Sequence, residues 1–259
     1  MMIDFLANIR AVIYRNALWA YRSPFRLIDI VLWPIVALFT LTFFLSSTGG
    51  AEQFTGLLVL SIIGWRAIFF VTFETTAIFI EEHWDDSLPN LLVCPINPKE
   101  LALGGALTGM LKAIVVVFLC LAVGSVAYGF TLTQPFQFIL ALFCLMLAGL
   151  SIGFVLFGLA CCFEKRNIFS LSFMIPELVA LFSGPYYDVN KVFPSWLAAI
   201  SNTFPTTHAF NVIKSIFGMA EADYTMLVAT SLVWLVAAIV INDILYQKGR
   251  KKGTLVKFG

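Results

Sequence analysis

Four ionisable side chains lie within stretches of the sequence that are otherwise apolar, and they are Arg66, Glu74, Lys112 and Glu177. A charge at the centre of a bilayer costs roughly 2.5–3.5 kcal/mol on insertion scales, so such residues pair with one another or face a wet cavity. Two interpretations are therefore open. Either a basic residue pairs with an acidic one and holds a helix bundle together, or some of the four line a route through a membrane.

Aromatic side chains accompany two of these charges in the stretch 54–80. Phe70 stands midway between Arg66 and Glu74 at helical spacing. A row of three aromatic residues follows the neighbouring face of the same helix: Trp65, Phe69 and Phe73. Such a row can grip an apolar or sugar-containing cargo. Phenylalanine also commonly faces lipid, so we expect lipid contact for at least one of the three.

The segment 81–100 joins two apolar stretches and begins with a concentration of acidic residues around Trp84. The acidic residues are Glu81, Glu82, Asp85 and Asp86; the leucines after them are Leu88, Leu91 and Leu92; the closing prolines are Pro95 and Pro98. This segment has too little apolar area to fold as a domain, but it suits a short helix that docks into a groove on a cytosolic partner. A solvated loop between two helices explains the composition equally well.

No residues are grouped for catalysis or for metal binding. The five cysteines lie mostly inside apolar stretches and form no C-x-x-C pair, and the two histidines are far apart in the sequence. Cysteines in such surroundings are usually packing residues. We therefore expect no metal site and no catalytic residue, and no nucleic-acid-binding pattern is present either.

The composition indicates an integral membrane protein. Hydrophobic residues make up 60% of the 259 residues and charged residues only 12%, against about 45–50% and about 25% in soluble domains. A helix needs about 20 apolar residues to cross a bilayer. Six stretches qualify as membrane-spanning helices: 27–45, 54–80, 101–128, 136–163, 168–182 and 226–246.

Two further segments are expected to lie at the membrane without crossing it. Residues 1–23 show apolar side chains at helical spacing and are predicted to form an interfacial helix. The region 183–221 is apolar but interrupted by prolines, which stop helices. We expect short interfacial or re-entrant helices there, in one all-α domain over residues 1–259.

Positive charges predict the orientation. Basic residues cluster before the first stretch, in the loops after the second and fourth, and after the last, whereas the opposite side carries only Lys191 and Lys214. Because cytoplasmic loops are rich in Lys and Arg, both termini are predicted to be cytoplasmic. An even number of spans agrees with this orientation.

Two groups of short motifs resemble the type-2 permeases of ATP-binding-cassette (ABC) exporters. The segment 81–100 resembles the coupling segment of that family, with DDSLPNLL at 85–92 as the helix and CPINPKE at 94–100 as its exit. The region after the fifth stretch resembles the family's proline-rich elements, with FSGPYY at 182–187, FPSWL at 193–197 and NTFPTTHA at 202–209. Each motif is degenerate alone, and their order and spacing make the match specific.

The resemblance implies a permease subunit that exports its cargo across the plasma membrane of a bacterial or archaeal cell. It implies a homodimer bound to two ATPase subunits, which hold ATP and Mg²⁺, with no cofactor in this chain. The segment from Glu81 to Leu92, with Pro95, would contact the ATPase. In the family the second and fifth spans enclose the central route, which favours Arg66, Glu74 and Glu177, with the aromatic residues beside them, as its lining.

A nucleotide site in this chain is not expected. Residues 104–112, GGALTGMLK, imitate a phosphate-binding loop but lack its Lys-Ser/Thr ending and lie inside an apolar stretch. Close helix packing through Gly105 and Gly109 explains the glycines better, and Gly149 and Gly153 are expected to do the same.

Two other functions agree with part of the sequence. A secondary transporter or channel could use the buried charges as ion or proton sites, but the acidic segment would then have no role. An intramembrane enzyme, such as a lipid-modifying transferase, would need polar residues grouped near one membrane face, for example around His83 or His208. A lipid, glycan, peptide or amphipathic compound is compatible as cargo with an aromatic, sparsely charged route.

Overall fold

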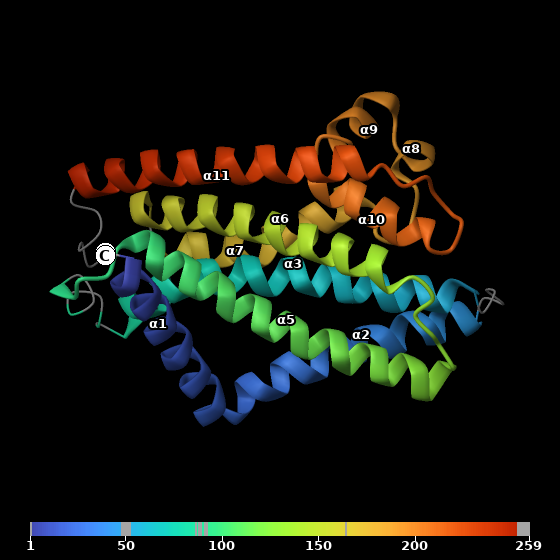
Figure 1. Ribbon diagram of the computed structural model, residues 1–259, viewed down its shortest axis with the longest axis horizontal. Coiled ribbons are helices and arrows are strands. Elements are labelled where there is room, and N and C mark those ends of the chain that lie inside the picture. Colours follow the sequence, from blue (N-terminus) through green and yellow to red (C-terminus); the bar gives the residue numbers. More distant parts are fainter. Residues whose placement is uncertain are drawn as a thin grey trace.

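The computed structural model describes residues 2–47, 53–85, 87, 90, 93–163 and 165–252 as an all-helical bundle, without a strand among them. Most of the helices lie side by side along the long axis of the molecule (Figure 1). The long helices are α1 (Met2–Arg22), α2 (Pro24–Ser47), α3 (Gln53–Trp84), α5 (Pro98–Tyr128), α6 (Pro135–Cys162), α7 (Lys165–Ser183) and α11 (Tyr224–Lys252). The short ones are α8 (Val189–Val192), α9 (Ser195–Ser201) and α10 (Pro205–Ser215).

Among the described residues, four helices are long and apolar enough to cross a membrane: α3, α5, α6 and α11. They contain four of the six stretches that the sequence predicts as spans. The other two stretches lie in α2 and α7, whose apolar parts, Ile30–Leu45 and Asn167–Ser183, are shorter. The chain is therefore an α-helical membrane protein with four clear candidate spans.

Helix α3 forms the centre of the bundle. In its most apolar part 78% of the residues are buried, against 22% in α5 and 17% in α11. It packs against α2, α5, α6 and α7. A helix that neighbours surround in this way must be apolar on all faces, which explains why its sequence shows no polar stripe.

Glycines bring α5 and α6 against the backbone of α3. A Cβ atom on Gly105 would lie 2.6 Å from a backbone oxygen of α3, and one on Gly109 would lie 2.5 Å from another. On α6, a Cβ at Gly149 would lie 2.9 Å from an α3 carbonyl, and one at Gly153 would lie 2.6 Å from Thr75 Cβ. Larger side chains would force these helices apart, so the predicted small-residue packing is confirmed.

The N-terminal segment is helical, as predicted. Part of its apolar stripe faces the bundle, because Ile9 and Val12 are buried and Val12 packs on Gly104 of α5. Leu6, on the same stripe, is 61% exposed. The helix is thus docked along α5, and its position at a membrane surface stays a prediction.

The region 183–221 contains the short helices α8, α9 and α10, as its prolines predict. The Asp188 side chain caps α8, and Pro205 occupies the first turn of α10. This region and α1 lie at opposite ends of the molecule, and the end of α11 lies on the side of α1 (Figure 1). Lys214, which the charge pattern assigns to the outer side, is 3% exposed and donates to Tyr187 O at 2.7 Å.

Candidate functional site

The end of the bundle that carries α1 holds the segment between α3 and α5. Four of the residues predicted to contact an ATPase lie outside the described residues: Asp86, Leu88, Leu91 and Leu92. Their role stays a prediction. The other five are placed by the end of α3 and by the turn that starts α5.

The start of α5 is fixed by local hydrogen bonds. Asn97 Oδ1 accepts from the Lys99 backbone N–H at 3.0 Å, and Glu100 Oε2 accepts from the Asn97 N–H at 2.9 Å. With Pro98 in the first turn, this is a capping box. The sequence Asn-Pro-Lys-Glu therefore sets where the segment 81–100 ends and the helix begins.

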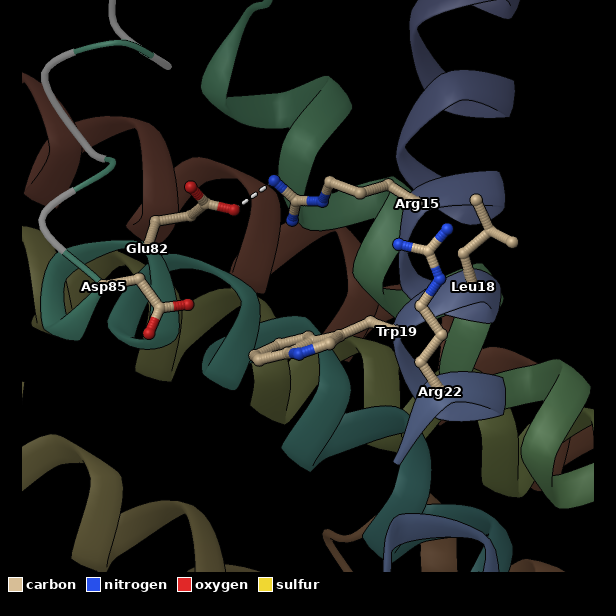
Figure 2. A pocket seen from close by; sticks show the side chains of 6 residues that line it. All are labelled: Arg15, Leu18, Trp19, Arg22, Glu82 and Asp85. Carbon is tan, nitrogen blue, oxygen red and sulfur yellow. Dashed lines mark hydrogen bonds and ion pairs between the residues drawn. The ribbon is translucent and has the colours of Figure 1, made fainter. Parts of the chain in front are cut away.

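Helix α1 binds both ends of the segment. At its exit, Asn8 Nδ2 donates to Pro95 O at 3.0 Å and to Glu100 Oε2 at 2.9 Å. At its entry, Arg15 forms an ion pair with Glu82, which also accepts a hydrogen bond from Ser87 Oγ. Figure 2 shows the Arg15–Glu82 pair bridging α1 and α3.

A cavity of about 300 Å³ lies beside this ion pair. Four side chains of α1 and two from the end of α3 line it: Arg15, Leu18, Trp19, Arg22, Glu82 and Asp85. In Figure 2 the Trp19 ring lies between Arg22 and Asp85. Glu82 is engaged by α1, whereas Asp85 is exposed.

The two remaining residues of this group, Trp84 and Glu81, each contact the bundle, although Trp84 is 49% exposed. The ring of Trp84 packs on Phe169 of α7, with centroids 4.5 Å apart. Glu81 follows Glu74 by seven residues, which places both on one face of α3. Glu81 and Glu74 line the same cavity, described next.

A second cavity, of about 240 Å³, lies between α3, α5 and α7 with one residue from α2. It is lined by Ile30, Phe69, Phe70, Phe73, Glu74, Glu81, Lys112, Phe169 and Phe173. Lys112 and Glu74 form an ion pair across it, and their side chains are 13% and 12% exposed. The sequence allowed several pairings of the four apolar-stretch charges, and this one is present in the structure. The pair also lines the cavity, so the two interpretations are compatible for Glu74.

The aromatic row of α3 faces α7. Phe69 and Phe73 stack with ring centroids 5.8 Å apart, and both rings contact Phe173. Phe73 also contacts Phe169. In the structure these two phenylalanines therefore pack within the chain. Phe169 and Phe173 were not singled out from the sequence, although their four-residue spacing repeats that of Phe69 and Phe73.

The charge of Arg66 lies against two aromatic rings. Arg66 is 9% exposed, and its guanidinium lies over the rings of Trp65 and Phe69, at 4.5 Å and 5.7 Å from their centroids. Glu177 is exposed on α7.

Within the described part of the chain, no three His, Cys, Asp or Glu side chains are close enough together to hold a metal ion. The described residues form two sites on α3. One is the cavity beside Glu82 at the end of the helix, and the other is the cavity at Glu74 in its middle.

The family model for ABC-2 type transporters matches residues 7–218. The chain belongs to the ABC-2 type transporter family. The match begins within α1 and ends just after α10, so it includes the segment 81–100, the charged cavity and the short helices. No curated protein matches the chain.

Membership of this family indicates that the chain is a transport permease. Domains of this family generally carry no catalysis of their own and typically work with an ABC ATPase. Asn8 and Arg15, which bind the ends of the segment 81–100, were not predicted as site residues. The available signal was that both lie off the apolar stripe of the first helix.

Proposed function

We propose that the chain is the permease subunit of an ABC exporter that works as a homodimer with two ATPase subunits in the plasma membrane. Helices α2, α3, α5, α6, α7 and α11 cross the bilayer, and both termini are cytoplasmic. ATP and Mg²⁺ bind to the ATPase, and cargo passes between the two protomers. The observation that carries this proposal is the family match over residues 7–218.

The segment 81–100 docks on the ATPase. Asp85 is exposed and can orient the partner, because electrostatic complementarity chiefly sets encounter and register. The leucines of the segment supply most of the binding energy, since burying one leucine side chain is worth about 1.5–3 kcal/mol before ordering costs.

Helix α1 passes a movement of this segment to two spans at once. Arg15 binds the segment's entry at Glu82, and Asn8 binds its exit at Pro95 and Glu100. A push on the segment therefore reaches α3 and α5 together instead of bending the loop between them. Asn8 and Arg15 are positioning residues in this scheme.

The route lies where α3 and α7 of the two protomers face each other. Glu177 supports this position, because an exposed carboxylate in the middle of a short apolar helix needs a polar or wet environment that lipid does not supply. A second copy and a water-containing route would supply it. The nearby Arg66 and aromatic rings suit an amphipathic cargo with a polar group, such as a lipid, glycan or peptide.

Co-expression with the ABC ATPase subunits of the same source, followed by pull-down in mild detergent, tests the proposal. The tagged chain should recover an ATPase in equal amounts, and the double variant Leu88→Asp, Leu92→Asp should lose it. Lys191→Asp, exposed at the opposite end of the bundle, is the matched control and should retain binding. A folded wild-type chain that recovers no such ATPase, or a double variant with full binding, contradicts the proposal.

A further inference from the structure

A third cavity, of about 590 Å³, lies between α6, α7 and α11. Its lining is apolar, with residues such as Val155 on α6, Leu178 on α7 and Ala237 on α11. The two polar groups in the lining are already satisfied within the chain: Ser151 Oγ donates to Leu147 O at 2.9 Å, and Trp234 Nε1 donates to Thr203 O at 2.9 Å. A molecule that fills this cavity must therefore be apolar where it contacts it.

The cavity is a long groove that is closed at one end. Helices α7 and α11 each pack on α6, which forms the floor. The rings of Phe204 and Trp234 pack 5.1 Å apart and close the end that faces α10. The lining residues of α7 run from Leu171 to Phe182, a rise of about 16 Å. This length is about half of the 30 Å hydrocarbon layer, which is the depth of one leaflet.

The shape and lining of the groove suit one apolar occupant. Its length of about 16 Å is that of an extended acyl chain within one leaflet, and its lining offers that chain apolar contact along the whole length. The groove opens on side chains such as Val233, which is 66% exposed, on helices that meet the bilayer. An unfilled groove would forfeit the dispersion contacts of its lining.

The charge beyond the open end indicates the head group. Ile241 is the last lining residue on α11, and Lys248 follows about 10 Å farther along the helix. The last turn of α11 adds three basic residues: Arg250, Lys251 and Lys252. A lipid whose chain lies in the groove with its head group at this end meets positive charge, which favours an anionic head group.

We propose that this groove binds one acyl chain of an anionic membrane phospholipid, with the head group near the basic end of α11. The site is separate from the cavity at Glu74 and from the segment 81–100. It does not depend on which cargo the protein carries or on the ATPase.

Photo-crosslinking tests the site in the full chain reconstituted in nanodiscs of phosphatidylglycerol and phosphatidylcholine. A phosphatidylglycerol with a diazirine in its acyl chain should label residues 171–182 and 233–241. Ala237→Trp fills the groove and should lower this labelling at least tenfold. Val236→Trp, on the same helix but outside the lining, is the matched control and should label like the wild type. Leu178→Trp fills the groove from α7 and replaces Ala237→Trp if that variant does not fold.

Competition identifies the head group. Unlabelled phosphatidylglycerol should displace the probe at a concentration several-fold lower than phosphatidylcholine does. Equal labelling of the groove-filling and control variants, or equal competition by the two lipids, overturns the proposal. So does a change from dimer to monomer in Ala237→Trp but not in Val236→Trp, because the groove would then be a subunit interface.

Discussion

The Lys112–Glu74 ion pair allows a direct test of what the buried charges do. Both side chains are close to nine-tenths buried, and they join α5 to α3 inside the membrane domain. Removing one partner of a buried pair leaves the other charge uncompensated, which costs about 3–5 kcal/mol. Because the pair lines a cavity, the lower figure is the better one, and about 3 kcal/mol lowers Tm by roughly 6–12 °C in a chain of this size.

The prediction concerns three variants. Lys112→Met and Glu74→Gln should each lower the Tm of the detergent-solubilised protein by that amount. The double variant removes both charges and should lie within about 5 °C of the wild type, because replacing a whole buried pair is often nearly neutral. Thermal stability followed by size-exclusion chromatography after heating measures all three. Lys191→Met is the control, since it removes an exposed ion pair worth about 0–1 kcal/mol.

Transport by the same variants separates the two interpretations of Glu74. If the pair only holds the helices, the double variant should regain transport together with stability. If Glu74 also contacts cargo, the double variant should be stable and remain defective. Additive losses in the double variant would refute the reasoning, because two groups that do not interact energetically cannot be the pair that joins α3 to α5.

Three further changes test the fold, a buried lysine and α1. Gly109→Leu should push α5 off α3 and sharply reduce the yield of folded protein, whereas Leu111→Ala on the exposed face of α5 should not. Burial lowers the pKa of Lys214 to about 8 from its usual 10.5, so the unfolded chain keeps this proton over a window where the folded chain has lost it. The Tm of the wild type minus that of Lys214→Met should therefore increase from pH 8 to pH 10. A Tm difference that is the same at both pH values contradicts this prediction. In the reconstituted complex, the double variant Asn8→Ala, Arg15→Ala should still bind the ATPase and hydrolyse ATP. It should lose the ATP-dependent changes in hydrogen exchange at residues 184–194. Changes there that equal those of the wild type refute the role of α1.

Local signals in the sequence predicted local structure well. The prolines between 183 and 221 predicted short helices, and the structure has three of them there. Gly105 and Gly109 predicted close packing, because only a small side chain lets two backbones approach, and the structure places them against α3. These features depend on the residue itself and its immediate neighbours.

Features that depend on which helix faces meet were not accessible from one sequence. Spacing put Lys112 and Glu74 at suitable depths but could not choose Glu74 over Glu177 as the partner. At least one residue of the aromatic row on α3 was expected to contact lipid; Phe69 and Phe73 pack on Phe173 of α7, which spacing alone could not show, and lipid contact by Trp65 stays a prediction. Charge counting assigned Lys214 to a side of the membrane and could not show that it is buried.

The packing of α3 differs between its neighbours, and this difference bears on how the domain can move. Glycines bring α5 and α6 onto the backbone of α3, and close-packed interfaces of this kind have little room to rearrange. The interface with α7 is made by large aromatic rings beside a cavity of about 240 Å³. On its other side α7 borders the groove of about 590 Å³.

Helix α7 therefore lies between two cavities, whereas α3, α5 and α6 form one tightly packed unit. Asn8 and Arg15 tie both ends of the segment 81–100 to α1, which packs on α5, so the proposed push on the segment would move α1 and the unit together. The relative displacement then falls between the unit and α7, where Arg66, Glu74 and Glu177 lie. The groove proposed for the lipid chain and the charged cavity lie on opposite sides of α7.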